Sequence, residues 1–312
     1  MYQPTRREFL AGSAAGLVAV QSGLLDCLAA DEKPAEMTIT KWSGPELGPD
    51  EIKQAAVKLT QKAIEGLGGM KRFVKQGDVV WVKPNIGWDR RPEQAANTNP
   101  DVLATIIRMA FDAGAKVIKV GDNPCDSAAK TYESSGLAAV AKELGAKVVF
   151  VDRSRFKKMP IGGERLKDHP VYPEIVECDA VINVPIVKHH VLAKITMCMK
   201  NFMGVVDNRG VFHQALPACI CDITRFMQPK TKLCVLDAVR ILKAHGPKGG
   251  NLADVATKLT VAAGTDMVAL DAWGAEVMGF KPADIQSIVK GAEAGLGKID
   301  YRSLALREIA VS

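Results

Sequence analysis

The sequence has few aromatic residues, no cluster of basic residues and no long hydrophobic run. Aromatic residues make up 5% of the 312 residues, and the 41 Lys and Arg residues are spread along the chain. A nucleic-acid interface typically gathers basic residues into a stripe with interleaved aromatic side chains, so a nucleic-acid partner is not expected. The net charge of +6 fits a mildly basic cleft for a small anionic molecule.

The hydrophobic fraction of 47% and the charged fraction of 24% are those of a globular protein, and they exclude a disordered, collagen-like or multi-span membrane protein. The apolar stretch at residues 11–20 is well short of the roughly 20 residues that a membrane-spanning helix needs. We therefore expect no stable membrane span in the mature chain. A chain of this length can bury a large core without disulfides or a structural metal.

The seven cysteines have neither the spacing of a zinc ribbon nor that of a ferredoxin, so an iron–sulfur cluster is not supported. Most of them lie in apolar segments, which predicts that they are core residues. Cys219 and Cys221 form the one close pair, and their spacing places the two sulfur atoms on different faces of a helix. A soft-metal site that includes Met197, Cys198 and Met199 is an alternative.

The N-terminus has the pattern of a twin-arginine export signal. Arg6 and Arg7 are followed by Phe9 and Leu10 and then by the apolar stretch. We interpret residues 1–30 as a signal peptide that is recognised by the twin-arginine translocation machinery, which predicts a periplasmic protein. The alternative is a chance arginine pair at a frayed terminus.

Short β-branched runs alternate with amphipathic segments along the rest of the chain. Asn99 is a candidate helix cap, and Gly114 directly follows the helix that Asn99 would begin. This alternation predicts an α/β fold with a largely parallel sheet, mixed at its edges, and helices on both faces. The expected strands are 79–82, 117–120, 148–151, 180–184 and 233–236, and the expected helices are 51–67, 100–113, 135–144, 253–259 and 283–294.

The domain organisation follows from the same pattern. Residues 31–49 are polar and rich in Pro and Gly, and we interpret them as a lead-in to one α/β domain over residues 50–312. Residues 153–172 mix basic residues with turn signals, which predicts a surface excursion that could cover the site.

Polar side chains follow several of the predicted strands. Lys83 and Asn85 end the first strand, Asp122 ends the second, and Lys188 and His190 follow the fourth. The carboxyl ends of parallel strands meet at one edge of a sheet, so these groups are expected to converge there. Each also has an ordinary structural interpretation, because Asp122 lies in a turn sequence and the lysines could be solvated.

A second group of polar residues lies further along the chain. Lys200 and Asn201 precede Gly204, and His213 follows. Two lysines and a histidine can hold a carboxylate or a phosphate, and a desolvated lysine near another cation has a pKa suited to general-base catalysis. His245 lies in a glycine-rich loop, where glycine allows close backbone approach to a ligand.

The order of these motifs resembles the family catalogued as "domain of unknown function 362". The resemblance covers about residues 79–300. Many members of that family carry twin-arginine signals, so the resemblance implies an exported protein. Other members carry fused iron–sulfur modules, but the cysteine run of such a module is missing here. The fold is also distantly similar to the N-terminal part of nickel-pincer lactate racemases, where lysine and histidine serve a cofactor and acid–base steps. The motifs are Lys83-Pro84-Asn85, Asn99-Pro100, Gly121-Asp122, Asn183-x-Pro185-x-x-Lys188-x-His190, Thr196-x-x-x-Lys200-Asn201-x-x-Gly204, His213, Asp237-Ala238, Gly246-Pro247-x-Gly249 and Asp266-x-x-Ala269-x-Asp271.

Two classes of function remain open on these observations. The first is an exported enzyme that acts on a small carboxylate or phosphorylated substrate, with or without a divalent metal. The second is a periplasmic protein that binds or delivers a metal or cofactor without turnover. A purely structural protein is disfavoured, because that role gives no reason for polar groups at so many strand ends. The candidate residues are Lys188, His190, Lys200 and His213 for catalysis, Lys83, Asn85, Asn201 and His245 for substrate binding, and Asp122, Asp237 and Asp271 for a metal.

Overall fold

The structure is a computed structural model that describes residues 34–312. The predicted signal peptide, its arginine pair and the first residues of the predicted lead-in lie outside the described residues.

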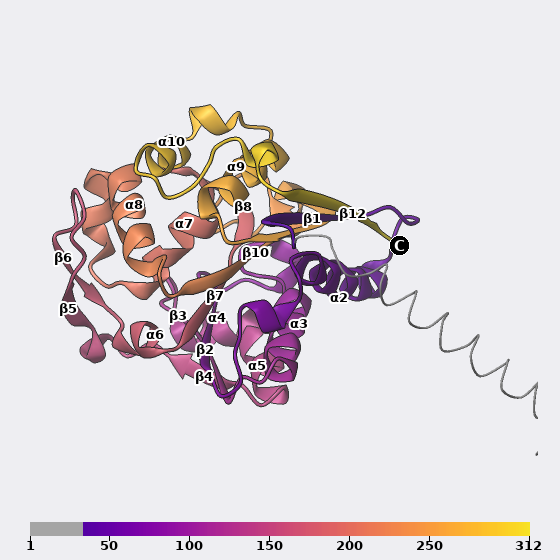
Figure 1. The fold of residues 1–312 in the computed structure, drawn as a ribbon, viewed down its shortest axis with the longest axis horizontal. Coiled ribbons are helices and arrows are strands. Elements are labelled where there is room, and N and C mark those ends of the chain that lie inside the picture. The colour runs from indigo at the N-terminus through magenta and orange to yellow at the C-terminus, as the bar shows by residue number, and fades with distance from the viewer. Residues whose placement is uncertain (1–33) are drawn as a thin grey trace, which may run out of the picture. The chain divides into compact units, whose positions relative to one another are not determined.

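A ten-stranded mixed sheet forms the centre of the described chain (Figure 1). The strand order is β12-β1-β11-β10-β7-β2-β3-β4, with β8 beside β10 and β9 beside β8. A separate hairpin consists of β5 and β6. The strands are β1 (Met37–Trp42), β2 (Val79–Pro84), β3 (Val117–Asp122), β4 (Lys147–Phe150), β5 (Lys157–Pro160), β6 (Asp168–Val171), β7 (Ala180–Val184), β8 (Ile186–His190), β9 (Lys194–Thr196), β10 (Thr231–Leu242), β11 (Val255–Gly264) and β12 (Leu306–Val311).

Parallel pairing dominates one half of the sheet. Strands β4, β3, β2, β7 and β10 pair with one another in parallel, whereas β11 is antiparallel to both β10 and β1. The predicted α/β class and the mixed sheet edge are confirmed.

Helices cover both faces of this sheet (Figure 1). Each face of the sheet has its own hydrophobic core, and alternate residues of β2 belong to different cores. Val80 and Val82 belong to the core that includes residues of α2, α3 and α5, while Trp81 belongs to the core that includes residues of α8 and α9. A strand buried on both faces must be apolar along its whole length, which explains the β-branched runs in the sequence. The helices are α2 (Pro49–Gly66), α3 (Pro100–Asp112), α4 (Ala128–Ser134), α5 (Leu137–Glu143), α6 (Pro173–Glu177), α7 (Cys198–Asn201), α8 (Leu216–Met227), α9 (Met267–Val277) and α10 (Gln286–Glu293).

The predicted start and end of α3 are confirmed in detail. The Asn99 side chain accepts a hydrogen bond from the Asp101 backbone N–H, and Gly114 follows the helix with a φ of 109°. A positive φ suits glycine, because glycine has no Cβ.

Two predictions about the antiparallel side of the sheet were wrong. The helix expected over 253–259 is a short 3₁₀ turn followed by strand β11, and the predicted lead-in contains strand β1. Strand β1 pairs with β11 on one side and β12 on the other. The β-branched residues of β11 gain more from this pairing than from an isolated helical turn.

The surface excursion at 153–172 is the β5–β6 hairpin. It packs beside the segment that follows α7, where Val171 forms a β-bridge with Val206 and the His169 ring hydrogen-bonds the Asp207 carbonyl at 2.8 Å. It contributes no residue to the main cavity described below, so it does not cover that cavity.

The strand order reverses next to β2. The chain runs from β2 outward to β3 and β4, then returns to place β7 on the opposite side of β2. In an open α/β sheet such a reversal leaves a crevice at the carboxyl ends of the two strands, and ligands bind there.

Candidate functional site

A cavity of about 400 Å³ opens at this reversal, beside the carboxyl ends of β2, β3 and β8. Seven of the candidate residues line it, although they come from five separate segments of the chain. They are Asn85, Asp122, Lys188, His190, Lys200, Asn201 and His213.

A buried ion pair lies at the base of this cavity. Lys83 Nζ is 2.8 Å from Asp122 Oδ1, and both side chains are almost completely buried. Burial lowers the pKa of Lys83, and the charge of Asp122 opposes that shift. The Asp122 carboxylate also accepts hydrogen bonds from the backbone N–H groups of Ile86 and Asn123. Lys83 does not line the cavity. Its ion pair with Asp122 connects β2 to the end of β3.

Gly204 allows the next segment to approach this ion pair. A Cβ at this position would overlap the Asp122 carboxylate and lie close to Lys83 Nζ. The Gly204 carbonyl instead accepts a hydrogen bond from the Asn123 backbone at 3.1 Å. Glycine is therefore needed here to bring α7, with Lys200, to the cavity.

Three asparagines form a hydrogen-bonded chain between the strand ends. Asn183 donates to the Cys198 carbonyl at 2.9 Å, so its side-chain oxygen is free to accept from Asn201 at 2.8 Å. Asn201 then accepts from Asn85 at 2.9 Å. Because the chain ends on a backbone carbonyl, each amide orientation is fixed, and Asn85 must present its oxygen to Lys188.

Lys188 is fully buried at the end of this chain. Its Nζ donates to Asn85 Oδ1 at 2.9 Å and to the Ala96 carbonyl at 2.6 Å. Burial, followed by the charge of Lys200, lowers the pKa of Lys188 to about 7. A neutral amine has two N–H donors, and both are used here. In its neutral form the amine of Lys188 would have a lone pair without a partner among the described residues, and the side chain lines the cavity.

The polar side-chain atoms of Lys200 and Thr196, which both line the cavity, have no partner among residues 34–312. Lys200, on α7, forms neither a hydrogen bond nor an ion pair through Nζ, and burial lowers its pKa to about 8. Thr196 Oγ1 is buried and also unpaired. Buried polar groups are nearly always hydrogen-bonded, so the unpaired Thr196 Oγ1 is an exception, as are Thr38 Oγ1, Arg90 Nε and Ser134 Oγ elsewhere in the described chain. Lys200 is only partly buried, and its Nζ is available to a ligand.

His190 contributes a neutral ring. Its Nδ1 accepts from the backbone N–H groups of Leu192 and Ala193 at 3.1 and 3.2 Å, which places the ring hydrogen on Nε2. Burial and the charges of Lys200 and Lys188 lower the pKa of His190 to about 3. His190 is therefore a hydrogen-bond donor at neutral pH, while His213 is exposed at the cavity mouth.

Residues 80–276 match the family described as "Domain of unknown function (DUF362)". The chain belongs to this family. Every residue that lines the cavity lies within the matched segment of this DUF362 protein.

The DUF362 protein is similar to the "Thylakoid-associated protein sll1697" of Synechocystis sp., with 28% identity over 243 residues that cover 75% of this chain and 73% of that protein. Among solved structures it is similar to a protein from Thermotoga maritima (TM-score 0.42, 13% identity, 80% of this chain) and to the lactate racemase apoprotein from Thermoanaerobacterium thermosaccharolyticum (TM-score 0.44, 12% identity, 79% of this chain). The matches span only 60% and 58% of those two chains.

Within residues 34–312 of the DUF362 protein, we find no helix with the length and apolar character required to cross a membrane.

Besides Lys83, three of the candidate residues do not line the cavity. His245 is exposed, and its Nδ1 lies 2.9 Å from Asp254 Oδ2. Asp237 is buried and accepts from the backbone N–H groups of Asn99 and Val239. Asp271 accepts from Cys198 and Met199, at the start of α7.

The three carboxylates predicted for a metal are not brought together. In the described part of the chain, no group of three or more His, Cys, Asp or Glu residues is arranged to hold a metal ion. The oxygens of Asp122, Asp237 and Asp271 already accept backbone hydrogen bonds. The chemistry of these donors does not fit a divalent ion bound by the three residues.

The sequence analysis missed part of the lining. The cysteines were predicted to be mainly core residues, but Cys125 is exposed, lines the cavity and accepts a hydrogen bond from Arg209 at 3.5 Å. The five other described cysteines are buried as predicted. Trp88 and Pro247 line the cavity from loops whose positions depend on tertiary packing. Thr196 and Pro247 had a signal in the sequence, since both are part of the family motifs.

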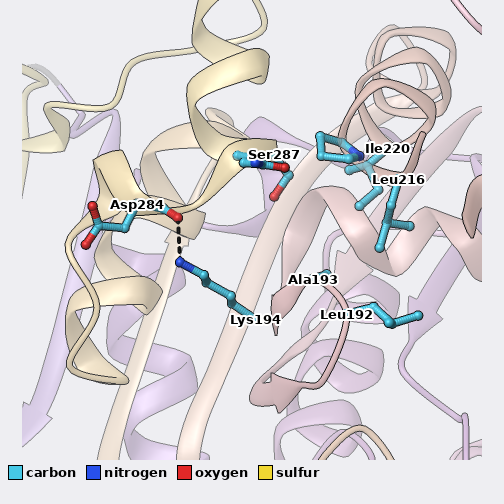
Figure 2. A pocket seen from close by; sticks show the side chains of 9 residues that line it. Leu192, Ala193, Lys194, Leu216, Ile220, Asp284 and Ser287 are labelled. Atoms are coloured by element: carbon cyan, nitrogen blue, oxygen red, sulfur yellow. Dashed lines mark hydrogen bonds between the residues drawn. The ribbon is translucent and has the colours of Figure 1, made fainter. Parts of the chain in front are cut away.

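A second cavity of about 220 Å³ lies beside the first. Figure 2 shows Leu216 and Ile220 of α8 on one side and Ser287 at the start of α10 on another, with Lys194 donating to the Asp284 carbonyl at 3.0 Å. Leu192 lines both cavities, so the turn between β8 and β9 forms a wall between them.

Proposed function

We propose that this DUF362 protein is an enzyme that transfers a proton to or from a small molecule carrying a carboxylate or phosphoryl group. The observation that carries this proposal is the pair of unpartnered groups, Lys200 Nζ and Thr196 Oγ1, in one cavity with Lys188. A cation and a hydroxyl are the donors that an anionic oxygen requires.

Lys200 and Thr196 hold the anion in this mechanism, and His190 Nε2 supplies a further neutral donor. The neutral amine of Lys188 takes a proton from the bound molecule and becomes an ammonium group. The new N–H bond forms at the lone pair, because Asn85 and Ala96 already accept the other two hydrogens. Reprotonation of the intermediate returns Lys188 to its neutral form.

Titration calorimetry with inorganic phosphate and with benzoate tests the anion site. Lys200→Met should weaken binding of either anion by about 10- to 100-fold, because a hydrogen bond to a charged group is lost. Lys53→Met, on the exposed face of α2, is the matched control and should bind like the wild type. Normal binding by Lys200→Met would refute the assignment, and so would a large loss of stability that explains any loss of binding.

Metal content distinguishes this proposal from a protein that binds or delivers a metal or cofactor. Elemental analysis of the purified chain is expected to find no stoichiometric metal that depends on the cavity residues. Metal that is lost in a Cys125→Ser or His190→Gln variant would favour the binding or delivery alternative.

We also propose that residues 1–30 direct export to the periplasm by the twin-arginine machinery. The pair Arg6 and Arg7 and the short apolar stretch support this proposal. Cell fractionation of the full chain should find it in the periplasm, and replacement of both arginines by lysine should retain it in the cytoplasm. Periplasmic protein in the double variant would contradict the proposal.

A further inference from the structure

Part of the lining of the main cavity is apolar, in contrast to its lysine, histidine and amide side chains. Trp88, Val191, Leu192, Met203 and Pro247 line it. These side chains come from four segments of the chain, so the apolar surface is not a consequence of one hydrophobic run.

Two of these residues are unusually exposed. Val191 is 72% and Leu192 is 62% exposed, at the turn between β8 and β9. Four large hydrophobic residues are exposed in the described chain, and the only two that are adjacent both line this cavity. Adjacent exposed apolar side chains at a cavity mouth are typical of a binding surface.

The same turn is bound to the polar half of the site. The N–H groups of Leu192 and Ala193 both donate to the His190 ring, so the position of the apolar turn and the orientation of His190 are fixed together. One ligand would therefore contact both halves.

We infer that the ligand of this site is amphipathic: an anionic head bound by Lys200 and Thr196, and an apolar body of several carbon atoms held by the Val191–Leu192 turn and Trp88. This inference rests on the proposed function, since it places the anion at the same donors. The cavity volume of about 400 Å³ is in the range that holds small organic ligands, and it exceeds what a bare phosphate or acetate would fill.

A series of straight-chain carboxylates, from acetate through butanoate and hexanoate to octanoate, tests the anion site and the apolar surface separately. Calorimetry on the full chain should show tighter binding with length, by about threefold for each methylene, because each buried methylene favours binding. Lys200→Met should weaken every member of the series by a similar factor and leave the dependence on length unchanged.

The double variant Val191→Ser/Leu192→Ser should reduce the dependence on length by at least half and leave acetate binding unchanged. Leu252→Ser replaces an exposed leucine (56%) outside the cavity, and it should behave like the wild type. All three residues are exposed, so folding is expected to be preserved, and thermal unfolding checks this.

Each outcome has one meaning. If acetate and octanoate bind equally well to the wild type, or if the double variant keeps the full dependence on length, the inference is overturned while the anion site stands. If no carboxylate or phosphate binds, the proposed function itself fails.

Discussion

Two lysines of this protein, Lys83 at the end of β2 and Lys200 on α7, have opposite environments. Lys83 is buried against Asp122, with its charge paired and its neighbours satisfied. Lys200 is half-buried and has no hydrogen-bond or ion-pair partner within residues 34–312. Lys83 therefore stabilises the fold through its ion pair, whereas the side chain of Lys200 is available to a ligand.

The difference teaches that a polar residue at a strand end is not by itself a functional residue. Asp237 within β10 and Asp271 in α9 are further candidate residues without a functional role here, because the carboxylate of each accepts hydrogen bonds from backbone N–H groups. What distinguishes the cavity is that Lys200 Nζ and Thr196 Oγ1 are both unpaired and line it together with Lys188, whereas the other unpaired buried atoms, Thr38 Oγ1, Arg90 Nε and Ser134 Oγ, do not line it. An unpaired buried polar atom costs stability unless a ligand completes its hydrogen bond.

The largest expected effect is on stability, at the paired lysine. Lys83→Met should lower the free energy of unfolding by about 3–5 kcal/mol, because it leaves the buried Asp122 charge uncompensated. Urea denaturation measures this. Lys119→Met removes a partly exposed pair with Glu174 and should cost no more than about 1 kcal/mol. Equal losses in Lys83→Met and Lys200→Met would erase the distinction between the two lysines.

The dependence of stability on pH gives the next effect. The folded-state pKa of Lys188, about 7, is below that of the unfolded chain, so the unfolded state binds more protons above pH 7 and stability rises with pH. Between pH 8 and 10 Lys188 should contribute about 1 kcal/mol per pH unit. Burial raises the pKa of Asp271 to about 7, so the titration of Asp271 lies mostly below this pH range. Lys188→Met should show a smaller slope by that amount, and an unchanged slope would mean that Lys188 is charged when folded.

The smallest effect concerns one hydroxyl. Thr196→Val removes the unpaired Oγ1 and keeps the shape of the side chain, so the free protein should gain about 1 kcal/mol of stability. Binding of benzoate should become about tenfold weaker, because the same group is then missing from the anion site. Thermal unfolding and calorimetry measure the two changes. A variant that loses stability and binds normally would show that Thr196 has a structural role.

The parallel half of the fold was predictable from the sequence, because its strands are buried on both faces and read as β-branched runs. The antiparallel half was not. Strand β1 lies in a polar segment and β11 has a weak helical pattern, so both depend on pairing with strands distant in the chain. Local preferences do not contain that information.

The site was predictable to the extent that strand ends converge. Asn85 and Lys188 meet at the strand ends, since parallel strands end at one edge, and Lys200 and Asn201 reach the same cavity from α7. Which groups stay unpaired was not predictable, because it depends on backbone partners such as the Ala96 carbonyl. The apolar mouth was missed for the same reason: nothing in the local sequence distinguishes an exposed Leu192 from a buried one.

A crystal of the full chain soaked with 4-bromobenzoate tests the central claim most directly, because the bromine can be located by its anomalous scattering. The account predicts a carboxylate within hydrogen-bond distance of Lys200 Nζ and Thr196 Oγ1, with the bromine against the Val191–Leu192 turn. Bromine signal only outside this cavity, with Lys200 and Thr196 still unpaired, would contradict it.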